Sequence, residues 1–490
     1  MRIPYPERIS YTGATVFATA LLAVQLLEHT QIYFAFCCFA YIFIATAAFN
    51  LAGGLYRPVG AYVFFNATLT LIVGLVIKVI VGEPADSNLL TPLRTIQVYL
   101  LGMVGILIAA YIENRFRRPR PVISTLFPMK DMRAAYIGSA IIGMVAKVVY
   151  LYVPTGGNGT FLTAFHNMDN FLPFALIIGV IYTIRASNGQ RSLTPGLFLL
   201  FALAFMIGLF AFSKQALYTP PVCWVIAAGI ARFKLKPVNV IFIILISVML
   251  IRYGPAYAFS RENETGTYGG DAKLVWYSMT HLEQLRIDST EGSQELIDTN
   301  YGLNYFNQPE GIFDRLEMIS PDDALIYATD RDGFFGYEPV KEYFENLIPH
   351  FLWPDKPVPY FGNMYAHEIG VLSSEDTGTG VSFGISGDAY HEGNFFGVIV
   401  VEPFCLIAGF LVISWMLGSV YDHPAVIVSI LMISHAAPEM AMGGPIFLIQ
   451  ISPVIVLLAF TCSYILPVFT SVFERKKPIA SIVSPALAAG

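Results

Sequence analysis

The sequence predicts an all-α polytopic membrane protein with about twelve transmembrane helices and one large, partly helical loop outside the cytoplasm. Two observations lead to this prediction. Hydrophobic residues make up 55% of the 490 residues and charged residues only 13%, which is too little charge to cover a soluble protein of this size. The one long polar segment, 254–393, holds 24 Asp or Glu against seven Lys or Arg. The net charge of −6 therefore comes from this loop and does not indicate a nucleic-acid partner.

The apolar segments define the predicted topology, because a helix needs about 20 apolar residues to cross a bilayer. Twelve stretches come near this length: 10–27, 32–50, 61–81, 95–112, 134–152, 170–185, 195–213, 216–231, 237–253, 394–418, 425–436 and 445–466. The first has no convincing small-residue cleavage site after it, so we expect an uncleaved span. The chain then divides into a bundle of about nine spans (1–253), the loop (254–393), and about three spans with a basic tail (394–490).

The distribution of Lys and Arg orients the predicted spans. Six of these residues lie in 113–133, three in 232–236 and three in the ERKKP sequence near the carboxy terminus. With twelve spans, these segments share one face, which the positive-inside rule assigns to the cytoplasm. Both termini are therefore expected to be cytoplasmic and the large loop extracytoplasmic.

Three helices are expected inside the loop. Residues 271–287 form the first, and the second starts at Ser320, as its N-cap, with Pro321 in the first helical position. The third covers 338–349 and carries an apolar face made of Val340, Tyr343, Phe344 and Leu347. The loop has no helix or strand pattern dense enough for a separate core, so we expect it to cover the membrane bundle as a lid.

Six cations are expected at or near the outer ends of the spans, where they would form a ring around an outward-facing cavity. They are Lys78, Arg94, Lys147, Lys214, Arg252 and Arg261. Such a ring suits an anionic ligand, most naturally a phosphate or diphosphate head group. The alternative for Lys78, Arg94 and Arg252 is a side chain that extends to lipid phosphates at the helix ends. Lys214 is the favoured ligand-binding cation, because it stands in a tight turn between two apolar spans.

Acidic and imidazole groups gather where the loop returns to the membrane. Asp388 and His391 are three residues apart, so on a helix they share a face, and a carboxylate can orient an imidazole as a general base. The alternative is that Asp388 caps the next helix and His391 is solvated. Glu402 is expected to line a polar cavity or to pair with a cation. Further groups expected at this cavity are Tyr390, Glu392, His435 and Glu439.

The sequence contains no P-loop, no H-E-x-x-H and no G-x-S-x-G motif. The acid pairs Asp322–Asp323 and Asp330–Asp332 leave a metal-bound sugar-nucleotide site as a minor alternative, although the first pair is already explained by a helix start. We therefore predict no metal and no cofactor.

Three features make the chain resemble the bacterial polysaccharide repeat-unit polymerases, the Wzy-type O-antigen and exopolysaccharide polymerases, which are related to O-antigen ligases. The first is the set of many spans with one large outer loop late in the chain. The second is the Ser-Lys turn FSKQAL at 212–217. The third is an Ile-Pro … Trp-Pro-x-Lys-Pro element at 348–357, followed by a Gly/Thr/Ser stretch, GDAY and NFFG. The resemblance covers most of the chain as architecture and about 50 residues in detail.

This resemblance implies a GT-C-like, metal-independent, inverting glycosyltransferase in the bacterial inner membrane. The donor would be a glycan on undecaprenyl diphosphate, and the acceptor a single lipid-linked repeat unit. Lys214, with Arg252 or Arg261, would stabilise the diphosphate. The base would be His391, or else Asp388, Glu392 or Glu439. Aromatic side chains expected to stack on sugars are Trp353, Tyr360, Phe361 and Tyr390.

The implied partners are the lipid-linked oligosaccharide, the membrane lipids, a chain-length regulator and a repeat-unit flippase. One departure concerns the Ser-Lys turn, where related enzymes often carry Arg, because Lys gives no bidentate contact to phosphate.

Two other functions are left open by the sequence. A ligase that moves a finished glycan to another acceptor would share nearly all of these features, and gene neighbourhood would distinguish it. A transporter fits twelve spans with cytoplasmic termini, but the sequence shows no inverted repeat and no paired broken helices.

Overall fold

The computed structural model describes residues 2–129, 131–152, 166–260, 268–288, 304–307, 317–348, 352–353, 356–357 and 360–468. This part of the chain is helical and contains no strand, only two isolated bridges. The predicted fold class is confirmed as an all-helical protein with several helices long enough to cross a membrane.

Eight helical segments are long and apolar enough to cross a membrane. They are Ile32–Ala52, Pro58–Val81, Pro92–Phe116, Met132–Val149, Met168–Ala186, Pro237–Gly254, Ile385–Leu417 and Gly443–Val468. Three shorter apolar helices are Tyr11–Leu27, Pro195–Phe210 and Val426–Glu439. All twelve predicted stretches are helical for most of their length. The number of crossings and the GT-C-like arrangement stay predictions.

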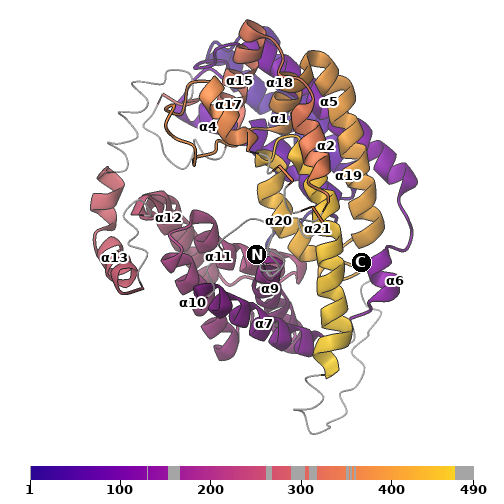
Figure 1. Cartoon of the computed structure of the whole chain (residues 1–490), viewed down its shortest axis with the longest axis vertical. Coiled ribbons are helices and arrows are strands. Elements are labelled where there is room, and N and C mark those ends of the chain that lie inside the picture. The colour runs from indigo at the N-terminus through magenta and orange to yellow at the C-terminus, as the bar shows by residue number, and fades with distance from the viewer. Residues whose placement is uncertain are drawn as a thin grey trace.

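The first group of helices packs around α2, α5 and α19 (Figure 1). Its members are α1 (Tyr11–Leu27), α2 (Ile32–Ala52), α3 (Pro58–Ala67), the π-helical turn η2 (Thr68–Ile72), α4 (Val73–Val81), α5 (Pro92–Phe116), the π-helical turn η6 (Gly397–Val401), α19 (Glu402–Leu417), α20 (Val426–Glu439) and α21 (Gly443–Phe460), which continues into the π-helical turn η7 (Thr461–Ile465). The short α6 (Val122–Leu126) packs on α19.

The second group lies beside the first in Figure 1. Its members are α7 (Met132–Tyr152), α9 (Phe171–Ala186), α10 (Pro195–Phe210), α11 (Lys214–Ile230) and α12 (Pro237–Phe259). Contacts of α9 with α20, and of α7 with η7, join the two groups, and one hydrophobic core runs through both. In α12 only 6% of the apolar stretch is buried. Because water would make so much exposed apolar surface unfavourable, this helix fits a lipid environment.

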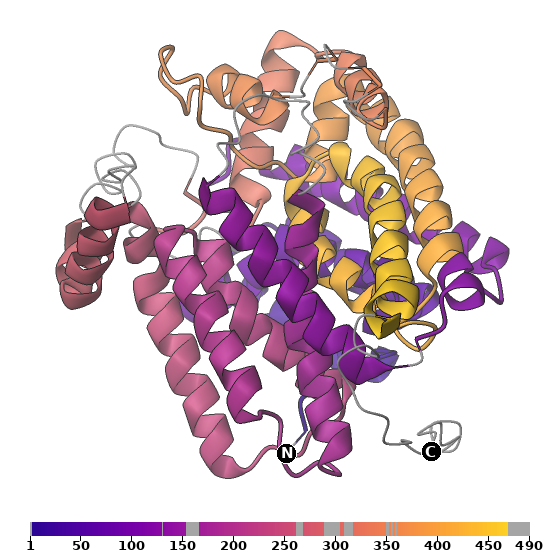
Figure 2. The ribbon, with the colours of Figure 1, turned by 60° about the horizontal axis from the view of Figure 1, so that its bottom comes forward.

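Among the helices of the polar segment that precede α18 are α13 (Tyr268–Thr280), α15 (Ile319–Asp332), α16 (Glu338–Glu345) and α17 (Phe361–Glu368). α15 packs on α5 and α17, α16 on α21, and α13 on α10. In Figure 2 the helices α15, α16 and α17, coloured salmon to orange, lie at the opposite end of the molecule from the amino terminus. The predicted topology requires the large loop and the amino terminus to lie at opposite ends of the molecule. Which end faces the cytoplasm stays a prediction.

Helices occur at all three predicted places in the loop, but with different bounds. α13 ends at Thr280, and a helix resumes only after His281. α16 ends at Glu345, so Leu347 of the predicted apolar face lies outside it.

α15 begins at Ile319 with Met318 as N-cap, so Ser320 lies inside the helix and does not cap it. The Ser320 hydroxyl instead donates a hydrogen bond to Glu317 Oε1 at 2.5 Å.

The predicted span at 394–418 also begins earlier than expected. α18 (Ile385–Phe396) precedes it, and the helix is interrupted at Gly393 and Asn394. Asn394 has a φ of 53°, which bends the chain before η6 continues into α19.

Candidate functional site

The polar end of the loop forms a buried helix. In α18 every residue from Ile385 to Gly393 is buried, although the segment contains Ser, Asp, His and Glu. α5 and α15 pack directly on it, and α19 follows it in the chain and contacts it. Gly384 provides an extended N-cap. The candidate acid and base residues therefore lie where the polar segment covers the membrane helices.

His391 is held by contacts to two other elements and to a loop. Its Nδ1 lies 2.8 Å from Thr329 Oγ1, and the Thr329 hydroxyl donates to the Leu325 carbonyl oxygen at 2.8 Å. Because that hydroxyl hydrogen is already used, Nδ1–H must donate to Thr329, which leaves Nε2 as the basic nitrogen. Nε2 lies 3.2 Å from Glu368 Oε2. Phe335 stacks on the imidazole with ring centroids 5.5 Å apart.

The alternative in which Asp388 caps the helix and His391 is solvated is wrong. Gly384 is the N-cap, and both Asp388 and His391 are fully buried. Asp388 Oδ2 accepts a hydrogen bond from the Met442 backbone N–H at 2.8 Å.

The remaining predicted acids differ in their surroundings. Glu392 and Glu402 are fully buried. Neither carboxylate oxygen of Glu392 has a hydrogen-bond partner among the described residues. Glu402 Oε1 accepts a hydrogen bond from Ser386 Oγ at 3.1 Å, and no ion pair of Glu402 occurs in the described ranges. Glu439 is partly exposed and lies 2.9 Å from His435 Nδ1.

The acid pair at the start of α15 joins three helices. Asp322 accepts hydrogen bonds from the Gly384 backbone N–H at 2.7 Å and from the Tyr99 hydroxyl at 2.8 Å. Asp323 accepts hydrogen bonds from the Thr95 hydroxyl at 2.5 Å and from backbone N–H groups of Leu90 and Thr91, just before α5. Burial raises the pKa of Asp322 to about 7 and also raises that of Asp323.

The alternative of a metal-bound sugar nucleotide gains no support from these acids. Asp330 binds Tyr390 and Arg94, while Asp332 binds Arg331. Within the described ranges, no group of three His, Cys, Asp or Glu side chains could hold a metal ion.

Four of the six predicted cations face carboxylates. Lys147 lies 3.0 Å from Asp169, and Arg252 lies 2.9 Å from Glu283. Lys78 and Arg94 pair with Glu83 and Asp330 at 2.7 and 3.2 Å. Arg261 and the side chain of Lys214 lie outside the described residues. The ring of cations therefore stays a prediction.

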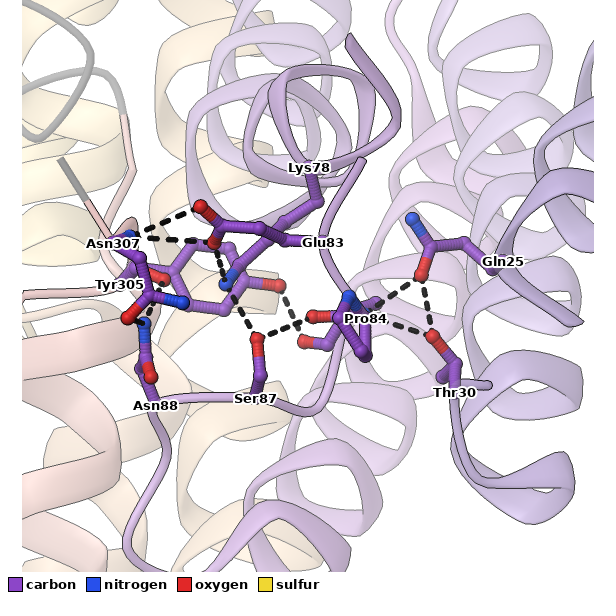
Figure 3. Close-up of polar contacts among 10 residues, drawn as sticks. Gln25, Thr30, Lys78, Glu83, Pro84, Ser87, Asn88, Tyr305 and Asn307 are labelled. Atoms are coloured by element: carbon purple, nitrogen blue, oxygen red, sulfur yellow. Dashed lines mark hydrogen bonds and ion pairs between the residues drawn. The ribbon is translucent and has the colours of Figure 1, made fainter. Parts of the chain in front are cut away.

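Lys78 is fully buried, so it extends to no lipid phosphate and that alternative is wrong for this residue. Figure 3 shows its ammonium between Glu83 and Ser87, at 2.7 and 2.8 Å. The ammonium also lies 4.5 Å from the centroid of the Tyr305 ring. The Glu83 carboxylate accepts a hydrogen bond from the Asn307 backbone N–H at 3.1 Å. Lys78 therefore attaches residues 304–307 of the polar segment to the turn after α4.

Replacing Lys78 by Met is expected to lower the free energy of unfolding by about 2 kcal/mol, because Glu83 loses its counter-charge. Thermal unfolding of the purified protein in detergent measures this loss. The matched control is Lys341→Met, whose exposed pair with Glu338 should leave the melting temperature unchanged. Equal melting temperatures for the Lys78 variant and the wild type would contradict the anchoring role.

Arg94 is the predicted cation that shares a network with α18. Its Nε donates to Asp330 Oδ2, and the Tyr390 hydroxyl donates to Asp330 Oδ1 at 2.6 Å. The guanidinium lies 5.1 Å from the centroid of the Phe395 ring. Arg94 and Asp330 are about one-third exposed, at 36% and 32%, so a ligand can reach this cation.

The predicted aromatic residues are not equally available to a sugar. Trp353 and Tyr360 are 36% and 53% exposed. The Tyr390 ring is buried and packs edge-on against Phe395, with centroids 5.3 Å apart, and Phe361 is buried as well. The exposed rings of Trp353 and Tyr360 are thus the better positioned for stacking on a sugar.

The residues that fix His391 were not predicted. Thr329 and Glu368 lie in different helices from His391 and in sequence surroundings without a motif. The chain matches no protein-family model, no curated protein and no solved structure.

Proposed function

We propose that this protein is a membrane glycosyltransferase that polymerises lipid-linked oligosaccharide repeat units at the outer face of the bacterial inner membrane. The observation that supports it most is the environment of His391. Its Nδ1–H is fixed by Thr329, its Nε2 faces the Glu368 carboxylate, and carboxyls of Asp388 and Glu392 lie in the same buried turn. A base oriented in this way suits proton removal from a sugar hydroxyl.

In the proposed reaction the acceptor hydroxyl oxygen attacks the anomeric carbon of the donor. The bond from that carbon to the diphosphate breaks, its electron pair leaves with the diphosphate, and the hydroxyl proton moves to Nε2 of His391. Arg94 stabilises the negative charge on the diphosphate, for which it must exchange its contact with Asp330. Because Phe335 and Glu368 cover His391, entry of the substrates requires these segments to move.

Loss of the gene tests this function directly. Cells without it should carry single repeat units on lipid, and cells complemented with the wild-type gene should carry long chains. Long chains that persist without the gene would contradict the proposal. Full-length glycans that accumulate on the lipid and are not transferred to their final acceptor would indicate a ligase. Activity of the reconstituted protein in a strong chelator is expected, whereas a loss that divalent ions restore would return attention to Asp330 and Asp332.

Replacing Arg94 by Gln is expected to weaken binding of the lipid-linked donor by about tenfold, because a charge-assisted hydrogen bond to phosphate is lost. The KM of the reconstituted enzyme for the donor measures this effect. Arg331→Gln is the matched control, because Arg331 follows Asp330 at the end of α15 and pairs with the exposed Asp332 instead of Asp330. An unchanged KM in the Arg94 variant would exclude this residue from donor binding.

A further inference from the structure

The first turn of α18 is surrounded by buried carboxyls from three helices. Asp322 of α15 accepts a hydrogen bond from the Gly384 backbone N–H, and Glu402 of α19 accepts one from Ser386 Oγ. Asp388 belongs to the turn itself. All three carboxyl side chains are fully buried, so negative charge is concentrated where water is excluded.

Glycines allow this close approach. A Cβ on Gly387 would lie 2.6 Å from Asp322 Cγ, and one on Gly384 would overlap the same carboxyl. A Cβ on Gly102 of α5 would overlap Ser386 Oγ and lie 3.2 Å from Glu402 Oε1. The backbones of α5 and α18 therefore enclose the carboxyls directly.

The donors around these carboxyls are neutral. They are backbone N–H groups of Gly384 and Met442 and the hydroxyls of Tyr99 and Ser386. No Lys or Arg forms an ion pair with Asp322, Asp388 or Glu402 in the described part of the chain. Burying a carboxylate without a counter-charge costs several kcal/mol, so the three groups cannot all be ionised unless a cation accompanies them.

A small cavity next to this turn offers further oxygen atoms. Its lining residues are Tyr41, Asn66, Thr70, Tyr99, Met103, Ile385 and Ser386. Thr70 is only 5% exposed, and its hydroxyl has no hydrogen-bond partner among the described residues. Glu402 Oε2 is also buried and also has no hydrogen-bond partner within the described ranges. Thr70 lies in the π-helical turn η2, and the π-helical turn η6 directly precedes Glu402. Such turns occur frequently at functional sites.

We propose that this pocket binds a small monovalent cation, either a proton held by its carboxyls or Na⁺ coordinated by Glu402, Ser386 and Thr70. Oxygen ligands suit such hard cations, and carboxyls inside membrane helices often mark proton or ion sites. The pocket is separate from Nε2 of His391, and its occupation does not depend on the proposed transferase activity.

Two titratable groups, Tyr41 of α2 and Tyr99 of α5, line the pocket itself. The elements packed around the carboxyls of this region carry the others, which are Tyr62 of α3, Asp322 and Asp323 of α15, Tyr343 of α16, Tyr365 and Glu368 of α17, Asp388, His391 and Glu392 of α18, and Glu402 and Cys405 of α19. Six of these groups are carboxyls, and none is a Lys or Arg, so binding of a cation should stabilise the folded protein.

The test is thermal unfolding of the full-length protein in phosphatidylcholine nanodiscs between about pH 5 and about pH 8.5, in a buffer that contains choline and no Na⁺. The folded-state pKa of Asp322, at about 7, is raised above its unfolded value. Protonated Asp322 therefore stabilises the folded protein fully below the pKa of this group in the unfolded chain. This contribution to stability is lost as the pH rises through 7. We expect a fall in melting temperature on the order of 3 °C from pH 6 to pH 8.

Adding NaCl at the high end of this range separates the two cations. If the melting temperature recovers with NaCl but not with the same concentration of choline chloride, the bound cation is Na⁺. If it does not recover, the bound cation is the proton. Asp322→Asn and Glu402→Gln should each weaken the pH dependence, whereas the control Glu375→Gln, at an exposed position of the polar segment, should keep it. Thr70→Val, which preserves volume, should remove any response to Na⁺ and leave the proton response in place.

Two results would overturn the proposal. One is a melting temperature that responds neither to pH in this range nor to Na⁺. The other is a pH dependence that is the same in Asp322→Asn, Glu402→Gln and the wild type. If these two variants do not fold, infrared spectroscopy of the wild type decides, because a carboxylic-acid C=O band must be present at low pH. That band must decrease as the pH rises or as Na⁺ is added, and its absence contradicts the site.

Discussion

Replacing His391 by Asn is expected to lower the rate of repeat-unit transfer by about 10²–10⁴-fold, while the protein still accumulates in the membrane. The Asn amide can keep a donor toward Thr329, which receives Nδ1–H in the wild type. The substitution removes Nε2, the nitrogen that Thr329 leaves basic. The initial rate of chain extension by the reconstituted protein, at saturating lipid-linked substrate, measures the effect.

The matched control is His281→Asn, because His281 is exposed in the polar segment and stacks on Tyr277, with ring centroids 4.3 Å apart. This variant should keep the wild-type rate. A His391 variant with a rate within about twofold of the wild type would exclude His391 as the base. Asp388, Glu392 and Glu439 would then be the acids to replace next.

The membrane helices were predictable from sequence because length and apolar composition alone define them. Each predicted span corresponds to a helix, including the short stretch 425–436, which corresponds to α20. The start of α18 was missed because ISGDAYHEG is polar and contains two glycines, which gives it neither apolar length nor helix propensity. This helix is buried because α15 covers it, and that is a contact between distant parts of the chain.

The partners of the candidate site illustrate the same limit. Asp322 and Asp323 were interpreted as acids of a helix start, and α15 does begin there. These carboxylates, however, accept hydrogen bonds from Gly384 and from residues in or just before α5, and the latter donors are more than 200 positions away. Periodicity and capping describe neighbours along one helix, so they contain no information on such pairs. Even the short-range partner of Lys78, Glu83 five residues further on, was not predicted, because Lys78 was expected to face an anionic ligand or lipid phosphate.

Gly397→Ala is expected to cost at least about 3 kcal/mol of folding stability, at or beyond the upper end of ordinary overpacking. Gly397 follows the interruption at Asn394, where η6 passes close beneath α18. A Cβ at this position would overlap the Ala389 carbonyl oxygen and lie 2.9 Å from its carbon. Because the obstacle is backbone, no side-chain rotation can relieve it, and α18 must move away from η6. The amount of folded protein extracted from membranes and its melting temperature measure the loss.

Gly196→Ala in α10 is the matched control, since a Cβ there meets no atom within 4 Å. Alanine also favours a helix over glycine by about 0.5–1 kcal/mol, so this variant should be as stable as the wild type or slightly more stable. A Gly397 variant with the wild-type melting temperature would show that α18 and η6 are farther apart than described. In that case Glu402 would no longer be tied to Ser386 by the close packing of these elements, and the enclosed carboxyl cluster would lose its basis. An unstable Gly397 variant beside a stable Gly196 variant supports the tight junction on which both the base and the cation pocket depend.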